Sequence, residues 1–354
     1  MDLVRASVEV MRQGQHRGGA YVASPTFPTY RYSWIQDGGF IAAAMDDSGE
    51  PDSAAAFHRW VSGVVVRRRS VIERLEREVP REITDRDVLH TRYTLEGKEG
   101  TEPWTNFQLH GYGYWLSSLA WHLRRTRRSP GEFVPAVRLV ARYLAVLWDR
   151  PCYDCWEEFP DHRHPATFAA VAGGLRHAAA LLDDAGPGDL AERILDRVLA
   201  RGTTAGVMSK FEHTDVVDGS ALLATGPLGA FPPGHPLVEE TVARIEADLV
   251  AEAGGVHRYL EDEYYGGGLW LPLSGSLAWV QAAAGRPDRA REVVRWMEEA
   301  ADREGNLPEQ VSRHVRKPER LQQWVDRWGP VANPLLWSHA MYVLARSVVG
   351  PIDD

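Results

Sequence analysis

Hydrophobic residues recur along most of this 354-residue chain with the spacing of α-helices, and the alternation typical of strands is scarce. One set of predicted helices is amphipathic. Between positions 189 and 200, for example, Leu190, Ile194 and Val198 share one side while charged residues occupy the other. Such a helix buries one stripe and leaves the opposite face in water. The same pattern recurs over residues 52–76, 132–148, 236–250 and 288–301.

A second set of predicted helices is apolar on nearly all sides and rich in Ala and Gly. A helix without a polar face must be surrounded by protein. These runs cover residues 38–44, 111–123, 166–182, 268–284 and 335–348, and residues 218–223 could begin a sixth, shorter one.

The connections between the two sets also differ. Each turn that leaves an apolar run carries Gly or Pro and an acidic residue, and we expect the acid to cap the amphipathic helix that follows. These turns are at 47–52, 129–132, 185–189 and 284–288. The segments that enter apolar runs are longer, acidic and aromatic; they are at 30–37, 104–110, 152–164, 211–215, 258–265 and 306–310.

Alternating outer amphipathic and inner buried helices predict an all-α fold, a toroid of six helix pairs known as the (α/α)6 barrel. We find no linker or shift in composition, so residues 1–354 are expected to form a single domain. In this barrel every segment that enters an inner helix opens at the same rim. The acidic and aromatic segments should therefore converge on one pocket. The longest irregular stretch, 79–105, is a candidate rim loop or lid.

Composition narrows the possible partners. The net charge of −9 argues against a nucleic-acid partner. The chain has no signal-peptide pattern and no apolar run of about 18 residues, so we expect a cytoplasmic protein with no membrane association. Its two cysteines, Cys152 and Cys155, are expected to be reduced thiols. Thirteen tryptophans supply flat faces of the kind that stack on sugars or bases.

The segment at 152–164 carries the most informative chemistry. Glu157 and Glu158 directly follow Trp156, and an indole that desolvates a carboxylic acid raises its pKa, as a general acid requires. Glycoside cleavage needs a second carboxylate on the opposite face of the substrate. Several candidates exist, and the residues alone leave the choice open: Asp37, Asp215, Glu261, Asp262 and Glu309.

We expect no metal and no cofactor, because the chain lacks clustered cysteines or metal-spaced histidines. The acidic pairs Asp46-Asp47 and Asp183-Asp184 lie in turns assigned to the opposite rim. Their expected role is structural.

Four blocks of sequence resemble one known family. They are Tyr-Arg-Tyr-Ser-Trp-Ile-Gln-Asp at 30–37, Cys-Tyr-Asp-Cys-Trp-Glu-Glu at 152–158, Arg-Tyr-Leu-Glu-Asp-Glu-Tyr-Tyr at 258–265, and Leu-Pro-Glu-Gln at 307–310 followed by Pro-Leu-Leu-Trp-Ser-His-Ala at 334–340. In this order they resemble glycoside hydrolase family 15, the glucoamylase family, across nearly the whole chain.

This resemblance implies an inverting, exo-acting α-glucosidase, with Glu157 as general acid and Glu309 as the general base that activates water. It further implies that Glu158 hydrogen-bonds a sugar on the acid's side. Asp37 and Arg258 would hold the glucose at the non-reducing end, Tyr30 would lie near the attacking water, and the walls of the pocket would be formed by Trp34, Trp156 and Trp270.

Two departures from the family pattern affect the predicted substrate. Gln36 occupies a position where the family usually has Arg, and His110 stands where bacterial relatives often have Asp. The chain also begins at the first barrel helix, with no N-terminal β-sandwich or starch-binding module. This favours a short oligosaccharide substrate, with isomaltose-type α-1,6 linkages ahead of maltose-type α-1,4 linkages and trehalose.

Two other protein classes deserve comparison. A non-catalytic, glucoamylase-like carbohydrate-binding regulatory protein would have no need to retain both Glu157 and Glu309. A terpene cyclase, another α/α toroid, would need an Asp-rich Mg²⁺ motif or an Asp-x-Asp-Asp acid, and the chain has neither.

Overall fold

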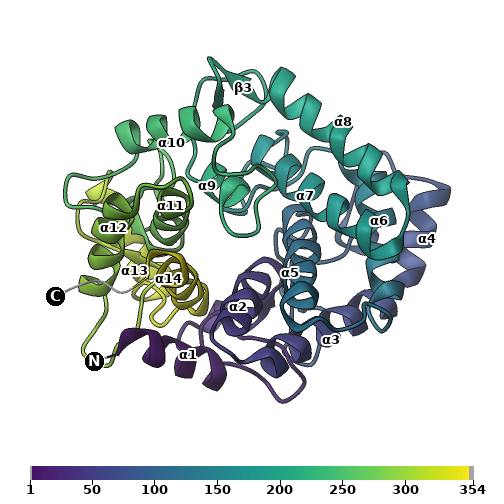
Figure 1. The fold of residues 1–354 in the computed structure, drawn as a ribbon, viewed down its shortest axis with the longest axis horizontal. Coiled ribbons are helices and arrows are strands. Elements are labelled where there is room, and N and C mark those ends of the chain that lie inside the picture. Colours follow the sequence, from purple (N-terminus) through teal and green to yellow (C-terminus); the bar gives the residue numbers. More distant parts are fainter. Residues whose placement is uncertain (1, 351–354) are drawn as a thin grey trace.

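A computed structural model describes residues 2–350, and within them six helices form a closed inner ring (Figure 1). Each inner helix contacts the next one along the chain, and α14 contacts α2, which closes the circle. The inner helices are α2 (Ile35–Asp47), α5 (His110–Thr126), α7 (Pro165–Leu182), α9 (Ser220–Thr225), α11 (Leu271–Ala283) and α14 (Leu336–Val349).

A second layer of helices surrounds this ring, so the predicted (α/α)6 barrel is confirmed (Figure 1). The outer helices are α1 (Leu3–Gln13), α3 (Pro51–Arg67), α4 (Arg69–Arg77), α6 (Val134–Leu147), α8 (Ala185–Arg201), α10 (Pro236–Asp248) and α12 (Pro287–Glu299). Helix α1 packs on α14 and α2, so the first and last helices of the described chain lie side by side.

The inner helices approach one another closely because their contact faces carry small residues. A Cβ atom added to Gly174 of α7 would lie only 2.6 Å from the carbonyl oxygen of Gly113 on α5. Any larger residue at either position would push the two helices apart. The Ala- and Gly-rich composition of the inner helices thus follows from the tight ring.

Several predicted boundaries and caps were wrong. The run at 52–76 is two helices, α3 and α4, separated at Arg68. Helix α8 begins at Ala185 rather than 189, with Asp184 as its N-cap accepting a hydrogen bond from the backbone N–H of Gly186 at 3.0 Å. The N-cap residues of α3, α6 and α12 make no such side-chain bond. Helices α1 and α13 (Pro318–Trp328) were absent from the predicted set.

Short strands join the loops at the rim where the inner helices begin. Strand β1 (Ser33–Trp34) pairs with β2 (Arg92–Tyr93), and β5 (Leu269–Trp270) pairs with β6 (Gln310–Val311). The third pair is β3 (Thr203–Thr204) with β4 (Val207–Met208), and 3₁₀ turns η1 (Pro28–Tyr30), η2 (Asp85–Asp87) and η3 (Tyr264–Gly266) complete the loops. Residues 2–350 therefore contain two-stranded sheets and no β-sandwich.

The strand pairs hold distant segments in register. Because β1 directly precedes α2 and β5 directly precedes α11, each pair fixes the entrance to an inner helix. The first pair attaches the stretch at 79–105 to this rim, as expected of a rim loop. The second places Glu309 beside the start of α11, since the backbone N–H of Leu271 donates to its carbonyl.

None of the helices in the described part of the chain combines the length and the apolar character that crossing a bilayer would require.

Candidate active site

A cavity of about 610 Å³ opens at the rim where the inner helices begin. Every residue to which the family resemblance assigned a role lines it: Tyr30, Trp34, Asp37, Trp156, Glu157, Glu158, Arg258, Trp270 and Glu309. Of the five candidates for the second carboxylate, only Asp37 and Glu309 face this cavity, whereas Asp215, Glu261 and Asp262 do not line it.

Glu157 is held by hydrogen bonds to one of its two carboxyl oxygens. Its Oε1 accepts from the indole Nε1 of Trp34 at 2.9 Å, from the indole Nε1 of Trp104 at 2.8 Å and from Nε2 of Gln108 at 3.1 Å. Desolvation raises the pKa of Glu157 above its ordinary value even though these donors oppose the shift. The other oxygen, Oε2, is left for a substrate, and a raised pKa favours the protonated acid.

The backbone conformation of Glu157 contributes to this placement. Its φ of 67° lies in the left-handed region, which non-glycine residues seldom adopt. Asp154 stabilises this turn, because its Oδ1 accepts from the backbone N–H groups of Trp156 at 3.0 Å and Glu158 at 2.9 Å. The turn directs the adjacent side chains of Glu157 and Glu158 into the same cavity.

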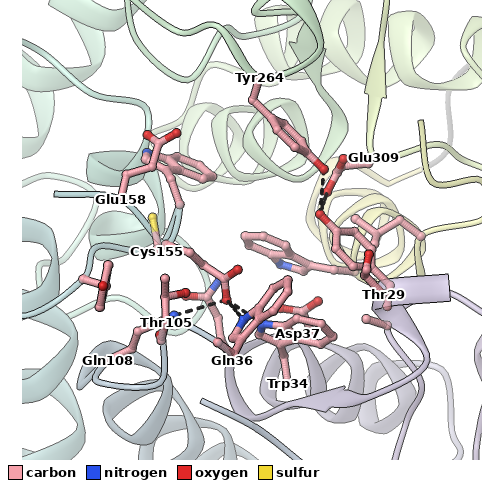
Figure 2. Close-up of a pocket in the computed structure, with 18 of the residues that line it drawn as sticks. Thr29, Trp34, Gln36, Asp37, Thr105, Gln108, Cys155, Glu158, Tyr264 and Glu309 are labelled. Atoms are coloured by element: carbon pink, nitrogen blue, oxygen red, sulfur yellow. Dashed lines mark hydrogen bonds between the residues drawn. The ribbon is translucent and has the colours of Figure 1, made fainter. Parts of the chain in front are cut away.

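Glu309 has a different environment on another wall. Figure 2 shows Glu309 and Tyr264 on one side of the cavity and Glu158 and Gln108 on the other. The Oε1 of Glu309 accepts a 2.9 Å hydrogen bond from the hydroxyl of Tyr30, which itself lies 2.8 Å from the hydroxyl of Tyr264. Its Oε2 is buried and has no partner among the described residues. Burial raises the pKa of Glu309 to about 7, so it can exchange a proton near neutrality.

Asp37 stands in the first turn of α2 and is also buried. Burial raises the pKa of Asp37 to about 8, and the nearby carboxylates of Glu157 and Glu309 add to the rise. Its sequence neighbour Gln36 lines the cavity but brings no positive charge, and its Oε1 has no partner among the described residues. Because Gln36 stands where the family usually has Arg, this position contributes no positive charge to the cavity.

Arg258 connects several walls of the cavity. Its Nε donates to Asp262 at 2.8 Å and its guanidinium lies 3.4 Å from Glu158, so it forms a structural ion pair and faces the cavity at the same time. The guanidinium carbon is also 5.2 Å from the ring centres of both Trp156 and Trp270. The second oxygen of Glu158 accepts a 2.6 Å hydrogen bond from the hydroxyl of Tyr259.

Beneath the turn that carries the two glutamates lies a buried ionic group that the sequence did not reveal. Lys210, which is 5% exposed, pairs with both Asp154 and Asp218. Asp218 in turn accepts from the indole Nε1 of Trp156 at 2.9 Å. One ammonium group thus pairs with two carboxylates: Asp154, which holds the backbone on either side of Glu157, and Asp218, which holds the indole of Trp156.

We expect Lys210→Met to destabilise the protein by about 3–5 kcal/mol, because it leaves two buried carboxylates without their cation. It should also lower kcat on the order of 10–100-fold through misplacement of Glu157. Chemical denaturation and steady-state kinetics measure the two effects. The matched control is Lys317→Met, which removes a half-buried lysine paired with the exposed Glu261 outside the cavity and should change neither quantity. An unchanged kcat in Lys210→Met would show that the turn keeps its shape without this cation.

Other residues of the site escaped selection from the sequence. Gln108 and Tyr264 lie in the acidic, aromatic segments that enter inner helices, and this position was the sequence feature that could have identified them as site residues. Only the structure shows that they hydrogen-bond to Glu157 and to Tyr30. Cys155 also lines the cavity, and both Cys152 and Cys155 are free thiols.

An (α/α)6 barrel whose cavity holds separate buried carboxylates among indoles and an arginine defines a carbohydrate-processing enzyme. The chain belongs to glycosyl hydrolases family 15, whose family model matches residues 3–271. The family predicted from the four sequence blocks is therefore confirmed, and the protein is a glycosidase.

Similar proteins agree with this assignment. The isomaltose glucohydrolase of Kribbella flavida is 41% identical over 358 residues, which cover 99% of this chain and 93% of the relative. A glycosidase variant solved in complex with glucose has a TM-score of 0.94 at 39% identity and covers 98% of this chain and 96% of its own. A bacterial glucoamylase complexed with acarbose shares the fold at a TM-score of 0.72 and 20% identity, and 55% of its chain is covered.

Proposed function

We propose that this protein is an inverting, exo-acting α-glucosidase that releases β-glucose from the non-reducing end of short oligosaccharides, with isomaltose-type α-1,6 linkages as its substrate. The observation that carries the proposal is the presence of two carboxyl groups in one cavity, those of the half-buried Glu157 and the buried Glu309, with separate hydrogen-bond partners and one unoccupied oxygen each. We propose residues 1–354 as one catalytic domain.

In the proposed reaction Glu157 is the general acid. It transfers its proton to the glycosidic oxygen as the bond from that oxygen to the anomeric carbon breaks. A water molecule attacks the anomeric carbon from the opposite face and loses a proton to Oε2 of Glu309, the general base. The new hydroxyl group therefore takes the β configuration when the scissile bond was α.

The remaining cavity residues would bind and orient the sugar. Tyr30 donates a hydrogen bond to Glu309 and would contact the attacking water. Asp37 and Arg258 would hydrogen-bond the hydroxyl groups of the terminal glucose, and Glu158 a sugar on the acid's side. The indoles that would form apolar walls against the sugar rings are Trp34, Trp156 and Trp270.

Two observations support the choice of substrate. The volume of the cavity, about 610 Å³, falls within the range of about 300–1,000 Å³ usual for small-molecule sites and suits a short sugar. The 41% identical relative is an isomaltose glucohydrolase and aligns with almost the entire chain. Maltose-type α-1,4 glucosides and trehalose are the alternative substrates within the same family.

A disaccharide screen tests the proposal. We expect glucose release to be fastest from isomaltose among isomaltose, maltose, kojibiose, nigerose and trehalose, with proton NMR showing β-glucose as the first product. α-Glucose as the first product would refute inversion. Preference for maltose or trehalose would replace the proposed linkage and keep the mechanism. Binding of these sugars without hydrolysis would instead favour a non-catalytic carbohydrate-binding protein.

A further inference from the structure

A second group of ionisable side chains is buried far along the helices from the cavity. Asp46 stands near the C-terminal end of α2, His58 lies within α3, and His122 lies in the second half of α5. Both histidines are fully buried, and Asp46 is 8% exposed. One potential ligand atom from each of the three residues lies within 4.8 Å of the others. The active-site cavity opens at the other ends of α2 and α5, so this group is separate from it.

The imidazoles of this group lack the hydrogen bonds that buried polar atoms normally make. Neither Nδ1 nor Nε2 of His58 has a partner among the described residues, and the same holds for Nε2 of His122. The two ring centres are only 5.2 Å apart. Native structures rarely leave buried nitrogens unpaired, and a water molecule or a metal ion bound between the two rings would satisfy them.

The third side chain supplies negative charge. Nδ1 of His122 lies 2.9 and 3.1 Å from the two carboxylate oxygens of Asp46. The neighbouring Asp47 is already engaged by Arg125 at 2.8 Å, Trp121 at 3.2 Å and Ser347 at 2.9 Å. Of these two aspartates, Asp46 is therefore the one whose carboxylate contacts a histidine of the group.

The side chains of the group offer the donor atoms that a metal ion needs. A neutral imidazole offers a lone pair, which is the form that coordinates metals. Two imidazole nitrogens and one carboxylate oxygen are a donor set that suits zinc, with water as a fourth ligand.

We propose that Asp46, His58 and His122 form a structural site for one divalent zinc ion. The ion would fasten two neighbouring inner helices, α2 and α5, to the outer helix α3, and so stabilise the ring without taking part in the reaction. The sequence led us to expect no metal, because the three residues come from separate helices and show none of the short spacings that mark zinc sites.

The test uses the full chain prepared without a polyhistidine tag. We expect elemental analysis to find about one zinc ion per chain, and removal of zinc with a chelator to lower the melting temperature by several degrees, reversed by added zinc. Cobalt(II) added to the chelator-treated protein should give the visible absorption bands of a four- or five-coordinate site. His58→Gln and His122→Gln should each abolish the bands and the zinc-dependent rise in melting temperature.

The control is His339→Gln. His339 is equally buried, but its ring nitrogens have partners in the backbone N–H of Leu307 at 3.0 Å and the hydroxyl of Ser7 at 2.9 Å. This variant should keep the full response to zinc and cobalt. If the wild-type chain contains no stoichiometric metal and neither ion changes its melting temperature or spectrum, the proposal is wrong. Because these measurements use the wild type, they decide the matter even if a histidine variant does not fold.

Discussion

Glu157→Gln is expected to lower kcat on isomaltose by about 10²–10⁴-fold while changing KM little. The glutamine is nearly isosteric, and its amide oxygen can still accept hydrogen bonds from Trp34 and Trp104. The side-chain amide cannot deliver a proton to the departing oxygen, so the loss falls on the chemical step. Steady-state kinetics measure it, with thermal melting to show that the variant is folded.

The leaving group provides a sharper test of the same assignment. A substrate such as α-glucosyl fluoride needs little acid assistance, so Glu157→Gln should lose much less activity on it than on isomaltose. Loss of the acid should also remove the fall in wild-type activity at high pH, where Glu157 would be ionised. The control is Asp37→Asn, which removes a proposed contact to the terminal glucose that both substrates share and should affect both alike. Equal losses on both substrates in Glu157→Gln would contradict its role as general acid.

The architecture of this protein was predictable because local sequence pattern encodes it. Helix α7 is apolar on all sides and α8 is amphipathic, and this difference alone assigned one to the inner ring and the other to the outer layer. The same alternation predicted which loops share a rim. Pattern did not predict that α3 ends at Arg67 or that Asp184 caps α8, since such boundaries depend on a few local hydrogen bonds.

The sequence predicted which residues line the candidate site, but it did not predict the hydrogen bonds and ion pairs between them. Motifs located Glu157 and Glu309, yet nothing in the sequence links Trp104 to Glu157 or Tyr264 to Tyr30. Lys210 lies in a segment without any motif and gains its importance only from two aspartates brought to it by folding. Such contacts join segments that are distant in the sequence and form only when the ring assembles. The hydrophobic periodicity predicts the helices but not these individual contacts.

The choice of the second carboxylate illustrates the same limit. Asp262 follows Arg258 by four residues, and either an ion pair or a shared substrate contact was compatible with that spacing. In the structure Asp262 is fully buried against Arg258, outside the lining of the cavity. Because Asp262 is buried and paired with Arg258, it is no longer a candidate for the second carboxylate, whereas Glu309 keeps an oxygen without a hydrogen-bond partner.

Glu309→Gln is expected to reduce kcat by about 10²–10⁴-fold, a loss comparable to that of Glu157→Gln but with a different signature. The amide oxygen can still accept from the hydroxyl of Tyr30, so the cavity should keep its shape. What the variant lacks is a carboxylate oxygen able to take a proton from water. It should therefore lose activity on α-glucosyl fluoride as severely as on isomaltose, because every substrate needs the attacking water.

The pH dependence of activity tests whether Glu309 or Asp37, the other candidate carboxyl group in the cavity, is the general base. Burial raises the pKa of Glu309 to about 7, so wild-type kcat/KM should fall as the pH drops through that region and the base becomes protonated. The residual activity of Glu309→Gln should lack this acidic fall. Glu261→Gln, which alters an exposed carboxylate outside the cavity, should keep both the rate and the profile of the wild type. If Glu309→Gln retains the wild-type kcat and the loss of activity at low pH, the general base must be another group. Asp37 is then the remaining candidate in the cavity, because burial also raises the pKa of its carboxyl group, to about 8.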